Sequence, residues 1–238
     1  MRGLGILNYK NDVVSGEHHF LKEYLSSCEK PILVDVGANE GSYSSAVLKV
    51  KKDARVFAFE PHPETYTRLT SVLSGAENVT CINAACGSAP GKLALFDYEG
   101  STGTQHASLH EGVIERVHNG RSAQRAVDVV TLDIFATNHN ISVIDLLKID
   151  TEGHELEVLK GAKHLLRRGG IKAIQFEFGE VNVVSRVFFR DFCDLLPNYK
   201  FHRMLRSGLI ALDPNMPLWC ELFGFQNIVA LPMIRNPE

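Results

Sequence analysis

The first regular pattern in the chain is a pair of short apolar runs that flank a helical repeat. Pro31–Gly37 (PILVDVG) is apolar and rich in β-branched residues up to its terminal glycine, which is typical of a strand buried on both faces of a parallel sheet. Apolar side chains then recur at helical spacing from Tyr43 to Val50, and a second run at Arg55–Glu60 (RVFAFE) is stopped by Pro61. This order predicts a β-α-β unit.

The alternation of apolar runs and helical repeats continues along the chain. Strands are expected at Val79–Ala85, Ile144–Asp150 and Ile171–Phe178, joined by the crossover helices that parallel strands require. Further strand candidates are Lys92–Tyr98, Arg125–Leu132, Lys200–Leu212 and Phe225–Leu231, and further helices are expected around Tyr66–Leu73, Leu156–Leu166 and Val184–Leu196. We expect the last two strands to form an antiparallel hairpin at the sheet edge. The pattern therefore predicts an α/β fold with a doubly wound sheet.

Two segments fall outside this alternation. Residues 1–30 are expected to form a helical lead-in to the first strand. Gly100–Gly120 is rich in Gly, Ser and His and has no clear period, so we expect a mobile loop or lid there. Because no internal repeat or low-complexity linker interrupts the chain, residues 1–238 are expected to form a single domain.

Composition narrows the class of protein. The chain is 45% apolar and 22% charged, which is ordinary for a soluble domain with a sizeable core. Its formal net charge is −3 and no block of Lys and Arg exceeds two residues, so nothing resembles a nucleic-acid-binding surface. No apolar run approaches the roughly 20 residues of a membrane span, and the first residues lack the layout of a signal peptide. A cytoplasmic protein with no nucleic-acid partner and no membrane span is expected.

Polar residues follow the predicted strands where ligands bind in α/β sheets, in the crevice outside the carboxyl ends of the strands. The first strand leads into Asp35–Gly41 (DVGANEG), whose glycines permit a tight turn and close approach of the backbone to a ligand. Glu60 ends the second strand about 20 residues further on, where Rossmann-like sites place an acid that accepts hydrogen bonds from ribose hydroxyls. The two features predict a cofactor that contains adenosine.

The charge of the loop indicates which of two kinds of adenosine cofactor it would bind. The loop has the pattern G-x-x-x-G rather than G-x-G-x-x-G, and Glu40 stands where a pyrophosphate needs bare amides. The carboxylates of Asp35 and Glu40 suit a sulfonium and an ammonium group better. S-adenosylmethionine is therefore expected. A NAD-dependent oxidoreductase or epimerase is the alternative, weakened by the missing third glycine and by the lack of a Tyr-x-x-x-Lys pair.

Two further strand ends complete the candidate site. Asn83 and Ala84 leave room for an adenine ring, although small residues also serve simply as core. Asp150, Glu152 and His154 follow a strand at the presumed methyl-transfer point, where one of them could accept a proton from an acceptor hydroxyl or orient it. Capping of the next helix is the alternative role for Asp150 and Thr151. In-line methyl transfer depends mainly on alignment, so a strong base need not be present.

The same region could also bind Mg²⁺ or Mn²⁺, which would lower the pKa of an acceptor hydroxyl. The candidate ligands are Asp150, Glu152, His154 and Glu177. The remaining histidines show no convincing ligand spacing, and His106 and His110 fall in the presumed lid. The five cysteines are odd in number and include no C-x-x-C pair, so we expect buried thiols rather than zinc ligands or disulfides.

Five motifs in order resemble the FkbM-type methyltransferases. They are VDVGANEG at Val34–Gly41, FEPHPETY at Phe59–Tyr66, INAACG at Ile82–Gly87, VTLDIF at Val130–Phe135 and LLKIDTEGHELEVLKGA at Leu146–Ala162. The resemblance covers roughly Val34 to Phe178. It implies a class I, Rossmann-like methyltransferase fold with a seven-stranded, mostly parallel sheet. It also implies S-adenosylmethionine-dependent methylation of a hydroxyl on a small molecule, usually a sugar, glycan or natural product.

The resemblance also assigns site residues by position. Those for the cofactor are Asp35, Gly37, Ala38, Asn39 and Gly41 on the methionine side, Glu60 and Pro61 at the ribose, and Asn83 and Ala84 at the adenine. Asp150, Glu152 and Glu155 match the acidic motif of the family. The chain resembles the family least in Gly100–Gly120 and after Glu180, and these parts would shape the acceptor pocket. A non-catalytic cofactor-binding protein is the third hypothesis.

Overall fold

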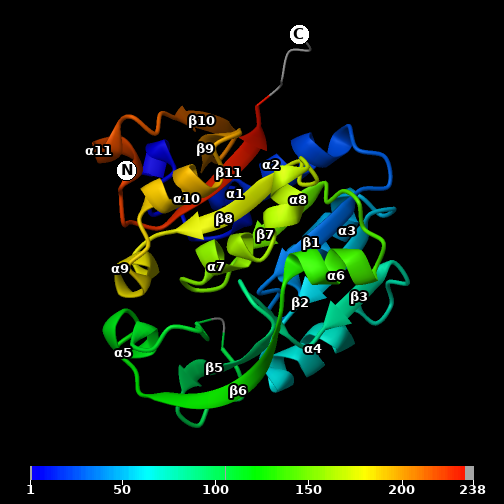
Figure 1. Ribbon diagram of the computed structural model, residues 1–238, viewed down its shortest axis with the longest axis vertical. Helices are drawn as coiled ribbons and strands as arrows, with labels where there is room; N and C mark the ends of the chain where they lie inside the picture. Colours follow the sequence, from blue (N-terminus) through cyan, green and yellow to red (C-terminus); the bar gives the residue numbers. More distant parts are fainter. Residues whose placement is uncertain (1, 105, 234–238) are drawn as a thin grey trace.

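The protein, described here by a computed structural model over residues 2–104 and 106–233, is built on one large sheet. The strands of this sheet are β1 (Ile32–Val36), β2 (Arg55–Phe59), β3 (Val79–Ile82), β7 (Leu146–Ile149), β8 (Ile174–Phe178), β9 (Tyr199–Leu205), β10 (Gly208–Leu212) and β11 (Gln226–Pro232). They lie in the order β10-β9-β11-β8-β7-β1-β2-β3 (Figure 1). The strands from β3 to β8 run parallel, whereas β11, β9 and β10 run antiparallel to their neighbours.

The antiparallel edge contains one strand more than the sequence predicted. Lys200–Leu212, predicted as one strand, folds into β9 and β10 because the exposed Arg206 and Ser207 form a turn between them. The last strand, β11, lies between β8 and β9, where Ile228 is paired with both neighbours. The doubly wound, mostly parallel α/β fold is therefore confirmed, with eight strands in the main sheet in place of seven.

Helices cover both faces of this sheet. One face carries α2 (Glu17–Ser26), α3 (Ser42–Val50) and α4 (Pro63–Leu73), and the other carries α6 (Leu132–Asn138), α7 (Glu155–Lys160), α8 (Lys163–Arg167) and α10 (Phe189–Leu195). Successive residues of β1 point to opposite faces, so that Leu33 packs with the first group and Val34 with the second. Burial of β1 on both faces explains why its sequence is almost continuously apolar.

A smaller sheet lies below the main sheet in Figure 1. It contains β4 (Ala85–Cys86), β5 (Gly91–Tyr98) and β6 (Ser122–Val130) in the order β4-β6-β5. The chain between β5 and β6 is the predicted lid segment, and it carries α5 (Val113–Arg116). The predicted strand Arg125–Leu132 ends at Val130 because Thr131 caps α6, its hydroxyl accepting a hydrogen bond from the Ile134 amide at 3.2 Å.

Two predicted helices are each divided in the structure. The helix expected over Leu156–Leu166 consists of α7 and α8. The helix expected over Val184–Leu196 consists of α9 (Val181–Ser185) and α10, because Arg186 has a left-handed backbone with φ +56° that ends α9. A short helix, α11 (Pro217–Cys220), precedes β11.

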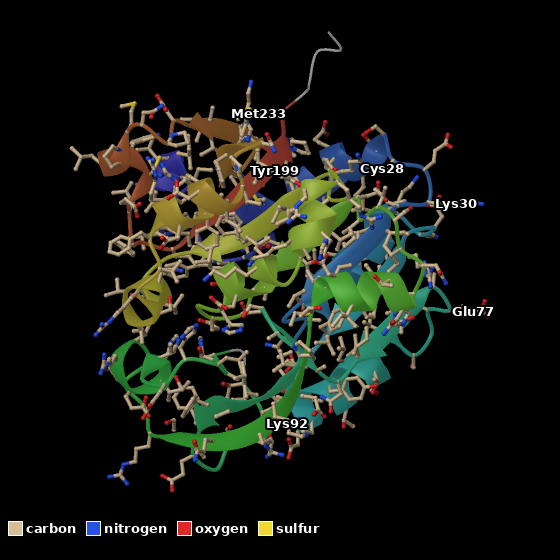
Figure 2. The ribbon with its side chains drawn as sticks, viewed as in Figure 1. Cys28, Lys30, Glu77, Lys92, Tyr199 and Met233 are labelled. Carbon is tan, nitrogen blue, oxygen red and sulfur yellow. The ribbon has the colours of Figure 1, made fainter. Side chains whose placement is uncertain are left out.

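The N-terminal segment folds into η1 (Arg2–Leu4), α1 (Asp12–Ser15) and α2. Figure 2 shows Cys28 just beyond α2 and Tyr199 at the start of β9. The five cysteines are free thiols; Cys86 and Cys220 are buried, and the other three are partly buried. Within residues 2–104 and 106–233, no helix combines the length and the apolar character that a membrane crossing requires.

Candidate active site

The turn after β1 is built around glycines with left-handed backbones. The amides of Gly37 and Ala38 both donate to the carbonyl of Phe59 at the end of β2, at 3.0 and 2.9 Å. Gly37 has φ +81°, and a Cβ added to it would lie 1.7 Å from the carbonyl oxygen of Asp150 after β7. Gly41, with φ +86°, is the N-cap residue that precedes α3. The turn packs against the ends of two neighbouring strands at once, an approach that only glycine permits.

Glu60, at the end of β2, is buried beside this turn. Its carboxylate accepts hydrogen bonds from the amides of Asn39 at 3.0 Å and His62 at 2.8 Å. The pKa of Glu60 is raised to about 7, chiefly because the carboxyl group is buried and, to a smaller extent, because Asp35 is near. The two backbone hydrogen bonds and the charge of Arg68 lower the pKa but do not outweigh burial. A carboxylate offers about four lone-pair sites, so each oxygen keeps capacity for a further donor. The carboxylate therefore suits a ribose with two adjacent hydroxyls.

The raised pKa of Glu60 predicts that cofactor affinity depends on pH. If Glu60 binds the cofactor ribose, as the sequence predicts, the two hydroxyls would hydrogen-bond the charged carboxylate best, so binding would lower its pKa and release a proton. Affinity for S-adenosylmethionine is expected to rise toward the pKa of about 7, by up to roughly tenfold per pH unit, and to level off above it. Isothermal titration at several pH values measures this slope. The cofactor ammonium also titrates, so Glu60→Gln is the control; equal slopes in both proteins would contradict the prediction.

The end of β3 holds the loop after β2 in place. The side-chain amide of Asn83 donates to the carbonyls of Glu60 at 2.8 Å and Pro61 at 3.1 Å. Ala84 is buried next to it and adds little bulk. Asn83 therefore fixes the backbone that carries Glu60, and its place at the adenine stays a prediction.

A buried row of polar side chains crosses the sheet behind the turn. Asp35 of β1, Lys148 of β7 and Gln175 of β8 are in register on adjacent strands. Lys148 is 3% exposed, and its Nζ lies 3.0 Å from a carboxylate oxygen of Asp150. Burial raises the pKa of Asp35 to about 6, whereas a 2.6 Å hydrogen bond from Ser44 and the charge of Lys148 lower it. The buried ammonium of Lys148 thus interacts with two acids of the candidate site, Asp35 and Asp150.

The same row of buried polar side chains also connects helix α2 to the sheet. The hydroxyl of Tyr43 donates to Gln175 at 2.7 Å, and the amide of Gln175 donates to Glu17 of α2 at 2.8 Å. The Lys148 ammonium lies 5.5 Å from the centre of the Tyr43 ring. Burial lowers the pKa of Lys148, but Asp150, Glu17 and further acids outweigh it and raise the pKa overall. Lys148 therefore stays charged in the interior.

The three candidate catalytic residues contact different neighbours. Asp150 pairs with Lys148. Glu152 faces two histidines of the lid segment, discussed below. Nδ1 of His154 lies 3.4 Å from Nε2 of His110, and burial, followed by the neighbouring His110, lowers the pKa of His154 to about 4. Of the three, Asp150 has its backbone against the glycine turn.

Helix α7 has no side-chain cap, since its N-cap residue is His154; Glu155, its first residue, instead binds the turn that precedes the helix. One of its oxygens accepts hydrogen bonds from the amides of Thr151 and Gly153, both at 3.0 Å, and from the Thr151 hydroxyl at 3.1 Å. Burial raises the pKa of Glu155 to about 7, although the hydrogen bonds from the backbone amides lower it. The acid that shapes the turn after β7 is therefore Glu155.

The predicted metal ligands do not form one cluster. In the part of the chain that the structure describes, the His, Cys, Asp and Glu side chains close enough to share one ion are His106, His118 and Glu152. Asp150 and His154 are directed to other partners, as described above. The predicted Mg²⁺ or Mn²⁺ site of Asp150, Glu152, His154 and Glu177 is therefore not supported.

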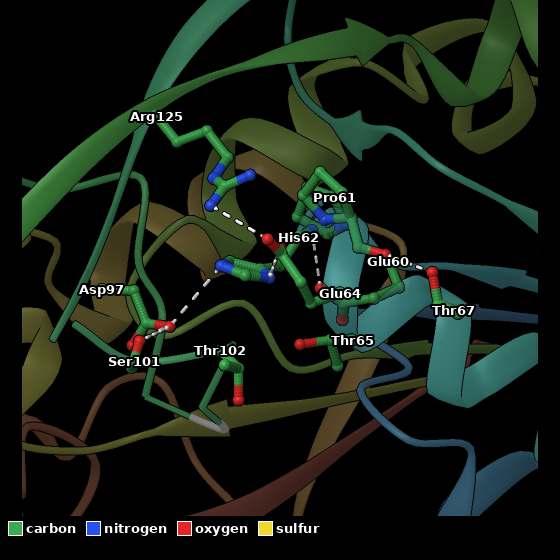
Figure 3. Close-up of polar contacts among 12 residues, drawn as sticks. Glu60, Pro61, His62, Glu64, Thr65, Thr67, Asp97, Ser101, Thr102 and Arg125 are labelled. Carbon is green, nitrogen blue, oxygen red and sulfur yellow. Dashed lines mark hydrogen bonds and ion pairs between the residues drawn. The ribbon is translucent and has the colours of Figure 1, made fainter. Parts of the chain in front are cut away.

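The start of the lid segment is fixed to α4 (Figure 3). His62, just before α4, lies 3.8 Å from Asp97 at the end of β5. Asp97 accepts hydrogen bonds from Ser101 and Thr104. The guanidinium of Arg68 donates to the carbonyls of residues 102 and 103, at 2.9 Å each, and pairs with Glu40 at 2.7 Å. The segment therefore leaves β5 close to the predicted cofactor loop.

Sequence reasoning gave no role to Lys148, Gln175, His62 or His118. For the first two a signal exists, since a polar residue inside an apolar strand must find partners on a buried face. For His62 and His118 there is none in the spacing, because their partners come from distant segments.

A cavity of about 310 Å³ lies between the lid segment and the chain after β8. Its lining residues are Arg116, Val117, Glu180, Val183 and Val184. A second cavity, of about 650 Å³, lies between α6 and α8 and is lined by none of the predicted site residues. The smaller cavity thus joins the two parts of the chain that the sequence associated with the acceptor.

The fold has counterparts among solved methyltransferases. The plantazolicin methyltransferase BpumL, solved in complex with SAH, superposes with a TM-score of 0.50 at 9% identity over 92% of this chain and 82% of its own. The human methyltransferase 10 domain containing protein gives 0.50 at 8% identity over 92% and 81%. These likenesses concern the fold. They show the Rossmann-like fold of class I methyltransferases.

The chain belongs to the FkbM methyltransferase family. The model of the methyltransferase FkbM domain matches residues 35–203. The 2-O-methyltransferase NoeI of Sinorhizobium fredii is 24% identical over 79% of this chain and 81% of its own length. The hexuronic acid methyltransferase AglP of Haloferax volcanii is 30% identical over 69% of this chain and 64% of its own. The protein is a methyltransferase, and the NAD-dependent and non-catalytic hypotheses are set aside.

Proposed function

We propose that this protein transfers the methyl group of S-adenosylmethionine to a hydroxyl oxygen of a sugar or sugar-containing small molecule. The observation that carries the proposal is the meeting of the Gly37 turn, Glu60 and Asp150 at the carboxyl edge of β1, β2 and β7. The names of two relatives, a 2-O-methyltransferase and a hexuronic acid methyltransferase, support the choice of acceptor.

The proposed cofactor site uses the loops after three adjacent strands. Its residues are Asp35, Gly37, Ala38, Asn39, Gly41, Glu60, Pro61, Asn83 and Ala84. Glu60 accepts hydrogen bonds from both ribose hydroxyls, since each carboxylate oxygen has a lone pair beyond those on Asn39 and His62. Asp35, beneath the turn, places negative charge near the sulfonium and ammonium groups.

Asp150 is proposed to orient the acceptor hydroxyl and to receive its proton. S-adenosylmethionine supplies an electrophilic methyl group: the oxygen–carbon bond forms as the carbon–sulfur bond breaks, and S-adenosylhomocysteine leaves with the electron pair. The hydroxyl proton passes to the Asp150 carboxylate, which Lys148 holds in place at 3.0 Å. The turn after β7 contributes mainly alignment, which is what a displacement on a sulfonium requires. Glu152 and His154 are directed elsewhere.

The acceptor is proposed to enter between the lid segment and α9. The cavity of about 310 Å³ there is large enough for a monosaccharide. Arg116 and Glu180 offer polar contacts and Val183 an apolar one, the mixture that a sugar with polar edges and apolar faces requires. A carboxylated sugar would pair with Arg116.

The cofactor site is tested by replacing the ribose-binding acid. Glu60→Ala is expected to weaken S-adenosylmethionine binding by about 1–3 kcal/mol, because the ribose hydroxyls and the amides of Asn39 and His62 lose their acceptor. Isothermal titration measures the loss. Glu77→Ala, an exposed acid beyond α4, is the control and should bind as the parent protein does. Unchanged binding by a folded Glu60→Ala protein would remove Glu60 from the site.

The acceptor class is tested with a panel of hydroxyl compounds. Purified protein is incubated with S-adenosylmethionine and with neutral glycosides, hexuronic acid glycosides or non-sugar phenols, and methyl ethers are identified by mass spectrometry. We expect methylation of the glycosides and its loss in Asp150→Asn. Methylation confined to the phenols would overturn the proposed acceptor, and methylation at nitrogen would overturn the proposed reaction.

A further inference from the structure

Two histidines of the lid segment meet an acid of the β7 turn. His106 and His118 lie on either side of α5, and their ring centres are 4.0 Å apart. Nδ1 of His106 is 3.7 Å and Nε2 of His118 is 3.9 Å from the carboxylate oxygens of Glu152. The three ligand-bearing atoms all lie within 4.8 Å of one another. Residues far apart in the sequence thus converge on one point.

Among residues 2–104 and 106–233, the two ring nitrogens that face Glu152 have no hydrogen-bond partner. These two atoms, His106 Nδ1 and His118 Nε2, are both buried from solvent. A separation of 3.7 or 3.9 Å from the carboxylate is too long for a hydrogen bond. Buried polar atoms are almost always satisfied, so the arrangement leaves a position for something between the three side chains.

We propose that His106, His118 and Glu152 bind a divalent transition-metal ion such as Zn²⁺. Ligand atoms about 2.0–2.1 Å from a tetrahedral ion lie about 3.4 Å from each other. The ligand atoms here lie within 4.8 Å of one another, so the cluster would close around an ion with side-chain movements of up to about 1.4 Å. Two imidazoles with one carboxylate select zinc or a neighbouring transition metal over Mg²⁺, which prefers oxygen ligands.

The backbone around Glu152 is shaped to present this carboxylate. Glu152 has φ +52°, a left-handed conformation that is costly for a residue with a side chain. The hydroxyl of Ser108, which is fully buried in the lid segment, donates to the Glu152 carbonyl at 2.7 Å. This hydrogen bond joins the stretch next to His106 to the turn, so the ion would bind where the lid segment and the turn are already in contact.

The bound ion has two consequences for the molecule. It ties the lid segment to the β7 turn through ligands on both sides, so metal binding stabilises this closed arrangement. Three protein ligands also leave a coordination position open, which would accept a water molecule or an oxygen of a bound compound.

Metal binding is tested directly, without cofactor or acceptor. The full-length protein is stripped with EDTA, dialysed and titrated with ZnCl₂ by calorimetry, with MgCl₂ as a parallel titrant. We expect one equivalent of Zn²⁺ and no saturable Mg²⁺ binding. His106→Ala, His118→Ala and Glu152→Gln should each weaken Zn²⁺ by more than about 100-fold, beyond the effect of losing an outer-shell partner.

His110→Ala is the matched control, because His110 lies in the same segment but outside the cluster. It should bind Zn²⁺ as the parent protein does. If the variants fail to fold, X-ray absorption of the Zn²⁺-loaded parent protein decides, with two imidazoles and no sulfur expected. Lack of saturable Zn²⁺ binding, sulfur ligation, or equal affinity in all variants would overturn the proposal. Each of these results leaves the proposed methyl transfer untouched, since that reaction is measured separately.

Discussion

Gly37→Ala is expected to destabilise the protein more than any other single methyl group added to the candidate site. The new Cβ would lie 1.7 Å from the Asp150 carbonyl oxygen, and the backbone at φ +81° is itself strained for alanine. The turn must therefore move away from β7 or the strand ends must separate. We expect a loss of at least about 3 kcal/mol, or roughly 6–12 °C in Tm for a domain of this size.

Thermal unfolding measures this loss, and Gly75→Ala is its control. A Cβ on Gly75 meets no atom within 4 Å, so its effect should stay within about 0.5 kcal/mol. A folded Gly37→Ala protein should also bind S-adenosylmethionine poorly, because the amides of the turn would be displaced. Equal stability of the two variants would mean that the turn does not pack on Asp150 as described.

Lys148→Met is expected to destabilise the protein by about 3–5 kcal/mol, the cost of leaving a buried acid without its cation. Methionine preserves much of the volume, so the effect reports charge rather than a cavity. Asp150 would lose its ion-pair partner, and Asp35 would lose the positive charge that lowers its pKa. Without it the pKa of Asp35 rises further, so the loss is largest at high pH and shrinks as the pH falls and the acid takes up a proton.

Lys92→Met tests whether burial decides this effect. Lys92 pairs with Asp128 at 2.6 Å, closer than Lys148 to Asp150, but both partners are about two-thirds exposed. Figure 2 shows Lys92 at the outer side of the small sheet. Exposed pairs contribute less than about 1 kcal/mol, so Lys92→Met should change stability little. Chemical unfolding of both variants across pH 5–8, a range of about three units around the acid pKa values, makes the comparison; similar losses would contradict the account.

The part of the candidate site near β1 and β2 could be predicted because it depends on local signals. A glycine turn after an apolar strand and an acid at the next strand end are features of short, contiguous stretches. Parallel strands bring such ends to one edge of the sheet whatever the details of packing. Glu60 therefore lies beside Asn39, joined by a 3.0 Å hydrogen bond.

The edge of the sheet was harder to predict, since strand pairing is not local. The apolar pattern of Phe225–Leu231 indicates a buried strand, but it does not say which strands lie beside it. In the structure β11 lies between β8 and β9, and this position completes the core. The division of Val184–Leu196 likewise depends on one residue, Arg186, whose left-handed backbone no helical period reveals.

The α/β class, the glycine turn and the acid at position 60 could be predicted from the amino-acid sequence, because burial and turn chemistry leave a periodic and local record. The eight-stranded order, the buried ion pair of Lys148 with Asp150, and the meeting of His106 and His118 with Glu152 became visible only in the folded protein. These depend on register and on contacts between distant segments, which are set by the packing of the whole domain.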